Sequence, residues 1–142
     1  MATGVGVADD LIEQFEAFKL QREPYNLRFY TYKIEDGLIV VDQTGPREAT
    51  YEDFCGCFLD NPDDPRYGLF DLEYQTDDGR PTSKLILFSY APDTAGVRAK
   101  MLYSGSKAAL KSVLTGVTVN ITATDASELD YDTVLQAAKR FG

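Results

Sequence analysis

Residues 84–90 read Lys-Leu-Ile-Leu-Phe-Ser-Tyr and indicate the centre of a β-sheet. The four apolar residues at 85–88 do not alternate with polar ones, which is typical of a strand that is buried on both faces. Residues 67–74 are similarly rich in apolar and aromatic side chains, and the Asp-Asp-Gly-Arg-Pro segment at 77–81 predicts an exposed turn between the two strands. We therefore expect this pair at the middle of a sheet with helices on both sides.

Further elements are expected on either side of this pair. Residues 27–34 and 38–43 flank a Glu-Asp-Gly turn and predict a hairpin, and residues 117–124 predict a fifth strand. Helices are predicted from Asp9 to near Pro24, from Tyr51 to Phe58 after an N-cap at Thr50, from residues 91–94 to about Leu114 with an interruption near 104–106, and over 127–140. The pattern predicts an α+β fold: three α/β/α layers with a mixed five-stranded sheet, in one domain over residues 1–142.

The composition argues against several classes of function. The 142 residues include 23 acidic and 14 basic ones, a net charge of −9, whereas nucleic-acid-binding proteins need a dense basic surface. With no histidine and two cysteines, the chain is expected to hold neither a metal ion nor a cofactor. Its apolar runs are much shorter than the roughly 20 residues that cross a bilayer, and its first ten residues lack a secretory pattern. We therefore expect a cytoplasmic protein without a membrane span.

The predicted long helix has two different faces when it is projected at about 100° per residue. The face expected to be buried contains Ala99, Leu102, Tyr103, Ser106, Leu110, Val113 and Leu114. The opposite face contains Val97, Met101, Ser104, Gly105, Ala108 and Ser112, bordered by Arg98, Lys100, Lys107 and Lys111. Small residues allow close approach, methionine adapts to an apolar cleft, and the cations attract an acidic rim. This pattern favours a protein-docking surface over an ordinary solvent-exposed helix.

A catalytic function is the alternative from a different class. The chain contains no nucleophile elbow, phosphate loop or dinucleotide fingerprint, and it has no histidine to serve as a base. Cys55 and Cys57 lie beside Phe54 and Phe58 on the predicted short helix, where buried apolar roles are favoured over a reactive thiol. We expect no enzymatic activity, and a small thiol-dependent enzyme that uses Cys55 or Cys57 is the remaining enzymatic alternative.

Five motifs follow one another along the chain. They are Met-Ala-Thr-Gly-Val at 1–5, Tyr-Glu-Asp-Phe at 51–54, Arg-Tyr-Gly-Leu-Phe-Asp at 66–71, Ala-Pro-Asp at 91–93 and Val-Arg-Ala-Lys-Met-Leu-Tyr at 97–103. Together they resemble the ADF/cofilin family of actin-depolymerising proteins over essentially the full chain. The resemblance implies an ADF-homology domain and a monomeric cytoskeletal protein that binds actin monomers and filaments and promotes depolymerisation. The alternative within this fold is a coactosin-like filament binder without depolymerising activity, which the intact segment at 98–101 disfavours.

The resemblance also implies two actin-binding sites. The monomer site is expected to comprise Thr3, Gly4 and Val5 with Arg98, Lys100, Met101, Ser104, Lys107 and Lys111. The filament site is expected to comprise Arg80, Lys84, Lys139 and Arg140. Thr3 occupies the place where many relatives carry a phosphorylated serine, so it is a candidate phosphorylation site.

Three positions depart from relatives that sever filaments strongly. Thr82 stands where a basic residue is usual, and Gln136 and Ala137 replace charged residues. These departures predict weak severing of filaments. The basic run that many relatives carry near Lys111 is diluted here, which predicts weak phosphoinositide binding.

Overall fold

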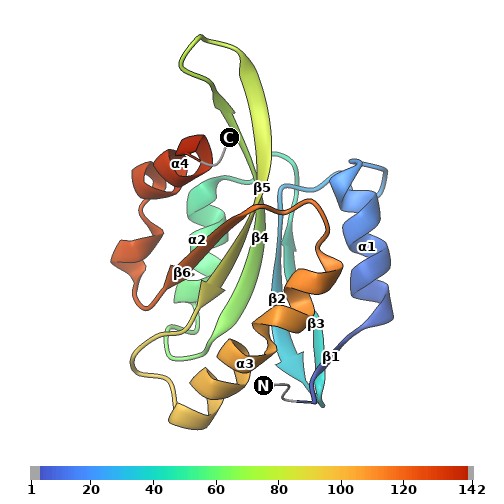
Figure 1. Cartoon of the computed structure of the whole chain (residues 1–142), viewed down its shortest axis with the longest axis vertical. Helices are drawn as coiled ribbons and strands as arrows, with labels where there is room; N and C mark the ends of the chain where they lie inside the picture. Colours follow the sequence, from blue (N-terminus) through green and yellow to red (C-terminus); the bar gives the residue numbers. More distant parts are fainter. Residues whose placement is uncertain (1–3, 141–142) are drawn as a thin grey trace.

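A six-stranded mixed sheet organises residues 4–140, the part of the chain that the computed structural model describes (Figure 1). Its order across the sheet is β1 (Gly6–Val7), β3 (Leu38–Gly45), β2 (Phe29–Glu35), β4 (Arg66–Gln75), β5 (Pro81–Tyr90) and β6 (Val119–Ala123). The two outermost pairs, β1 with β3 and β5 with β6, are parallel, and the inner pairs are antiparallel. The predicted α+β class is confirmed, but the predicted count of five strands is wrong. The two-residue strand β1 is too short to produce a periodic pattern.

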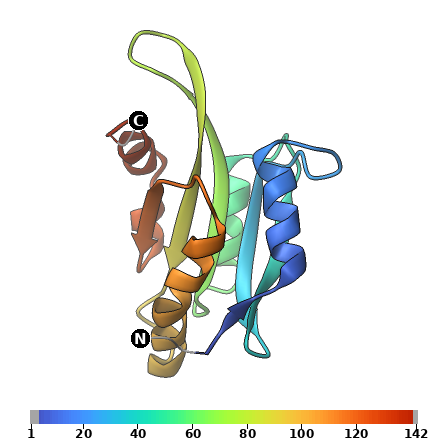
Figure 2. The same ribbon diagram turned by 45° about the vertical axis from the view of Figure 1, so that its right-hand side comes forward.

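Helices cover both faces of this sheet (Figure 2). One face packs against α1 (Asp9–Lys19) and α3 (Val97–Val113), and the other packs against α2 (Tyr51–Leu59), the short 3₁₀ helix η1 (Ala126–Leu129) and α4 (Tyr131–Arg140). A separate buried cluster fills each of these interfaces. The first includes Leu11, Phe15, Tyr30, Tyr67, Leu69, Leu87, Tyr103 and Leu110, and the second includes Phe29, Phe54, Phe58, Phe70, Ile86, Phe88, Val134 and Ala138.

The central strand β5 divides its apolar run between the two clusters. Leu87 packs on the side of α1 and α3, whereas Ile86 and Phe88 pack on the side of α2 and α4. All three are fully buried. This arrangement follows from the alternation of side chains along a strand, and it explains why residues 85–88 are continuously apolar.

Several predicted helix limits are wrong. The first helix ends at Lys19 instead of near Pro24, because Gln21 adopts a left-handed backbone with φ 53° and its side-chain amide donates to the carbonyl oxygen of Phe18. The long helix begins only at Val97, after an N-cap at Gly96. It continues unbroken through residues 104–106, where the prediction placed an interruption. Ser106 there is buried in the core-facing arc, so tertiary packing overrides the local preference.

The predicted C-terminal helix over 127–140 consists of two helices. The carboxylate of Asp125 accepts hydrogen bonds from the backbone N–H groups of Ser127 and Glu128 and thereby starts η1. The carboxylate of Asp130 accepts from the N–H of Thr133 at 3.3 Å and starts α4. Two capping aspartates five residues apart therefore divide the segment. By contrast, the predicted N-cap of α2 is confirmed, since Thr50 and Asp53 form a reciprocal capping box.

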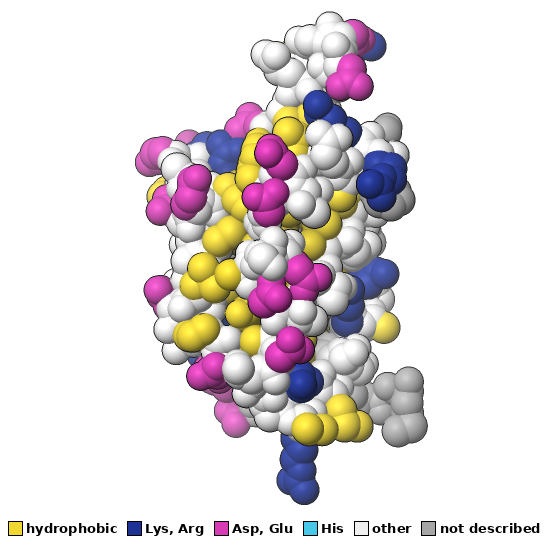
Figure 3. Space-filling model, turned by 90° about the vertical axis from the view of Figure 1, so that its left-hand side faces the viewer, with side chains coloured by type: hydrophobic (Ala, Val, Ile, Leu, Met, Phe, Trp, Pro, Cys, Tyr) yellow, Lys and Arg dark blue, Asp and Glu magenta, His cyan; other side chains and the backbone are white. Residues whose placement is uncertain are grey.

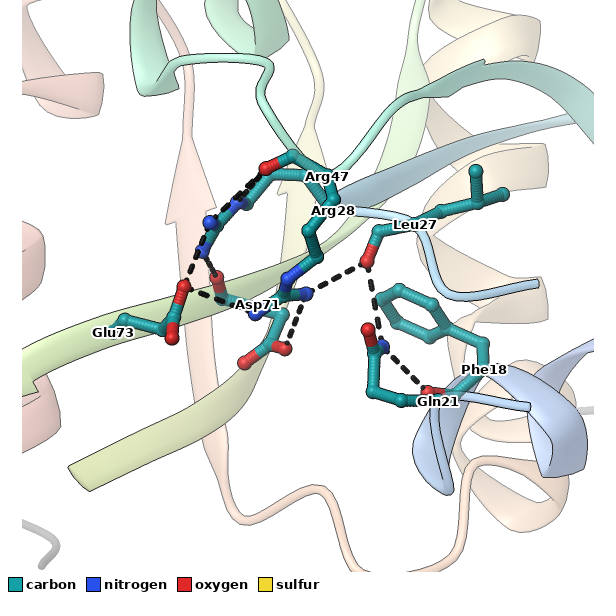
Figure 4. A network of polar contacts seen from close by, with 7 residues as sticks. All are labelled: Phe18, Gln21, Leu27, Arg28, Arg47, Asp71 and Glu73. Carbon is teal, nitrogen blue, oxygen red and sulfur yellow. Dashed lines mark hydrogen bonds and ion pairs between the residues drawn. The ribbon is translucent and has the colours of Figure 1, made fainter. Parts of the chain in front are cut away.

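A polar network near the end of α1 joins segments that are distant in the sequence (Figure 4). Arg47 donates to the carboxylate of Asp71 at 2.8 Å, and Glu73 contacts Arg28 at 2.7 Å and Arg47 at 3.0 Å. The Asp71 carboxylate is nearly buried, so Arg47 supplies the partner that a buried charge needs, while Arg28 donates to the backbone carbonyl oxygen of Asp71 at 3.0 Å. The network ties β4 to the residue before β2 and to the loop between β3 and α2.

Candidate functional site

The helix α3 presents its polar and apolar faces as predicted. Tyr103, Ser106 and Leu110 are buried, whereas Val97 and Met101 are 68% and 67% exposed. These two side chains are one helical turn apart and are the most exposed large hydrophobic side chains in residues 4–140. Burial therefore confirms which face of α3 is exposed.

Two hydrogen bonds of Tyr103 fix the rotation of α3 against the sheet. Its hydroxyl accepts from the backbone N–H of Ile34 in β2 at 2.9 Å. Its carbonyl oxygen accepts from the hydroxyl of Tyr67 in β4. Because β2 and β4 are neighbouring strands, these bonds hold the helix at a defined angle and keep Met101 pointing outward.

The start of α3 carries an unfavourable charge for a helix. Its first turn contains Arg98 and Lys100 and no acidic residue, and Gly96 provides no side-chain cap. Cations at this end interact unfavourably with the positive end of the helix dipole and with its free N–H groups. The start of α3 thus departs from the usual preference for acidic and capping residues, and it gains no stability from doing so. Such a departure is typical of a functional surface.

We call residues Val97, Arg98, Lys100, Met101, Ser104, Lys107 and Lys111 the α3 surface. None of its four basic side chains forms an ion pair within residues 4–140. Lys100 donates to the carbonyl oxygen of Asp93 at 3.4 Å, and Lys107 donates to the hydroxyl of Thr122 at 3.3 Å. Burial, and then the charge of Lys111, lower the pKa of Lys107. The α3 surface therefore has a positive charge that its own neighbours do not neutralise.

The N-terminal segment lies beside α3. Strand β1 contacts this helix, and Figure 1 shows both at the same end of the molecule. Gly4 is exposed with φ +79°, a conformation that favours glycine, while Val5 packs partly buried against the cluster under α1 and α3. Gly4 and Val5 thus directly precede the strand that contacts α3, and Thr3 lies outside the described residues.

The predicted filament residues lie at the other end of the molecule (Figures 1 and 2). Lys84 and Lys139 line a cavity of about 230 Å³ together with Thr82, and the amine of Lys84 donates to the carbonyl oxygen of Ala138 at 2.7 Å. Arg80 stays in the β4–β5 turn, where it pairs with Asp78 at 2.7 Å. The sequence analysis did not predict Asp78 as the partner of Arg80, although the two residues are only two positions apart.

The face over α2, η1 and α4 has a different character. Figure 3 shows acidic side chains on both sides of a strip of apolar ones. Cys57 there borders a cavity of about 610 Å³ between β3 and α2. Burial, followed by the nearby aspartates, raises the pKa of Cys57, and burial likewise raises the pKa of Cys55. Since the thiolate is the reactive form, these thiols are poorly suited to nucleophilic chemistry.

Within residues 4–140, no three His, Cys, Asp or Glu side chains are grouped so that they could bind a metal ion. None of the helices in this part of the chain is both long and apolar enough to cross a membrane.

Comparison with known proteins connects this arrangement to one family. The model of the cofilin/tropomyosin-type actin-binding proteins matches residues 4–139, a range that includes the whole α3 surface. The chain belongs to this family. It is 39% identical over 141 residues to a cofilin of Yarrowia lipolytica, covering 97% of this chain and 88% of that protein.

Solved structures of the family have the same fold. The crystal structure of a cofilin from Streptomyces griseoflavus superposes with a TM-score of 0.82 at 31% identity, covering 95% of this chain and 99% of that one. A human coactosin-like protein superposes with a TM-score of 0.76 but only 17% identity, over 95% of this chain and 98% of that one, which shows a shared fold alone.

Proposed function

We propose that this protein binds actin monomers and filaments and promotes filament depolymerisation, acting by binding rather than by catalysis. The observation that carries the proposal is the α3 surface: four basic side chains without ion pairs in the described residues lie along the helix that presents the exposed Met101. A protruding apolar side chain within a cationic rim fits an apolar cleft with acidic edges. Membership of a family of actin-binding proteins supplies the partner.

Several finer points belong to the same proposal. The protein would act as a cytoplasmic monomer of one domain, and the single sheet that the described strands form supports the assignment of one domain. Gly4 and Val5 would contribute to the monomer site beside α3, and phosphorylation of Thr3 would add negative charge there and weaken binding to an acidic partner. Phosphoinositide binding would be weak.

The proposal is tested by replacing both Arg98 and Lys100 with alanine. We expect this double variant to lose about 2–5 kcal/mol of binding free energy toward actin monomers, because both charges border the docking surface. Binding is measured by titration of labelled ADP-actin monomers. The control, Lys19→Ala with Arg22→Ala at the C-terminal end of α1, removes the same charge and should bind normally. Equal monomer affinity in both double variants would refute the assignment of this surface.

A coactosin-like activity is the second candidate. It would bind filaments without increasing the amount of soluble actin. The identity of 39% to a cofilin, compared with 17% to a coactosin-like protein, favours the depolymerising function. A pelleting assay distinguishes them, since only a depolymerising protein raises the actin that remains in the supernatant.

A further inference from the structure

The hairpin between β4 and β5 projects beyond the body of the molecule (Figures 1 and 2). Its tip, residues 76–80, is held by local hydrogen bonds: the N–H of Thr76 donates to the carbonyl oxygen of Arg80, and the N–H of Gly79 donates to that of Thr76, both at 2.8 Å. The hydroxyl of Thr76 also contacts the carboxylate of Asp78. The acidic side chains of the tip therefore have defined places next to the proposed filament site.

Each acid of the tip contacts one cation of that site. Asp77 pairs with Lys139 of α4 at 3.4 Å, although the two residues are 62 positions apart. Asp78 contacts the guanidinium of Arg80 at 2.7 and 2.8 Å. Both acids are well exposed, with 95% of the Asp77 side chain and 54% of the Asp78 side chain accessible.

The proposed filament site therefore differs from the α3 surface in its electrostatics. The basic side chains of the α3 surface lack ion pairs within residues 4–140, whereas Arg80 and Lys139 each have an acidic partner at the tip of the hairpin. Lys84 is also engaged, by the carbonyl oxygen of Ala138. An acidic partner at this end therefore competes with these contacts for the same cations.

We propose that Asp77 and Asp78 are internal counter-ions of the filament-binding surface, which weaken binding to filaments without affecting binding to monomers. This inference rests on the proposed function. Exposed ion pairs contribute little to folding, so the acids can be removed without loss of the structure. A negative charge at the rim of a docking surface nevertheless repels an acidic partner and competes for the basic side chains.

The experiment compares Asp77→Asn with Glu13→Gln, which removes the same charge from the exposed side of α1. Co-sedimentation measures filament affinity, and titration of labelled monomers measures monomer affinity. We expect Asp77→Asn to bind filaments about 2- to 5-fold more tightly than Glu13→Gln, with equal monomer affinity. Asp78→Asn should act in the same direction, since an asparagine oxygen can still accept from Thr76.

A second variant tests the pairing itself. In a Lys139→Gln background, the ion pair is lost and only the repulsion by Asp77 remains, so the additional change Asp77→Asn should improve filament binding less than it does in the unaltered protein. Equal filament affinities of Asp77→Asn and Glu13→Gln, or a gain of the same size without Lys139, would overturn the inference while leaving the proposed function intact. Failure of the unaltered protein to bind either form of actin would instead overturn the proposed function.

Discussion

Glu73 shows how one side chain couples the stability of the fold to pH. Its hydrogen bond with Arg28, together with the charges of Arg28 and Arg47, holds the pKa of the Glu73 carboxyl below its usual value of 4.5. The folded state therefore prefers the ionised form. Its stabilising contribution is complete above the pKa of the unfolded chain and is lost as the pH falls through the lower pKa of the folded protein.

The direction of this pKa shift leads to a prediction for Glu73→Gln. The variant should have a smaller free energy of unfolding than the unaltered protein at neutral pH, because the arginines lose their carboxylate. The difference should shrink as the pH falls below 4.5, since protonation then removes the same charge from the unaltered protein. Urea unfolding at several pH values measures it, with Glu48→Gln as a control for an exposed glutamate outside the network. A difference that is independent of pH would contradict the explanation.

At the level of secondary-structure elements, α2 packs unusually close to β4. A Cβ atom added to Gly68 would lie 2.6 Å from a ring carbon of Phe54 and 2.7 Å from one of Phe58. Both rings are fully buried, so neither can move into solvent. The absence of a side chain at position 68 thus sets the distance between the helix and the sheet.

Two glycine substitutions separate this packing effect from helix propensity. Gly68→Ala should lower the free energy of unfolding by about 1–3 kcal/mol, because overpacking forces the two rings out of place. Gly56→Ala lies inside α2, where no atom is within 4 Å of an added Cβ, and should raise stability by about 0.5–1 kcal/mol. Denaturant titration measures both. Equal effects of the two substitutions would refute the close approach.

For the whole molecule, the important feature is the separation of the two proposed sites. The first turn of α3 lies at one end, and the hairpin and the end of α4 lie at the other (Figure 1). A protein that contacts two filament subunits at once can use such a separation. Weak charge at the second site would then limit filament binding and severing more than monomer binding.

Severing should therefore increase when charge is restored at the second site. Of the two departures in α4, Gln136 is exposed, whereas Ala137 packs partly buried against the core. We predict that Thr82→Arg with Gln136→Arg severs filaments faster than the unaltered protein, since each charged contact contributes about 1–3 kcal/mol when partly desolvated. Filament imaging at equal occupancy measures the rate, with Thr82→Gln as an uncharged control. If the unaltered protein severed filaments as fast as a strong cofilin does, the missing charges at the second site could not be what limits the severing rate.

Features that depend on neighbours along the chain were predictable from the sequence. The apolar run at 85–88 indicated a doubly buried strand, and the projection of α3 separated Tyr103 and Leu110 inside from Val97 and Met101 outside. Both follow from the repeat of side chains along a strand or a helix, which needs no knowledge of the rest of the fold. The capping box at Thr50 is local in the same way.

Contacts between distant segments needed the folded chain. Strand β1 exists because β3 accepts it as a neighbour, and α3 stays helical through its Gly-Ser segment because Ser106 packs into the core. The pairing of Lys139 with Asp77 joins residues 62 positions apart, and no spacing rule relates them. Local preferences amount to a few tenths of a kcal/mol per residue, whereas burial of a large side chain contributes about 1.5–3 kcal/mol. Tertiary packing therefore decides the existence of β1, the continuity of α3 and the pairing of distant charges, while periodicity determines the longer elements.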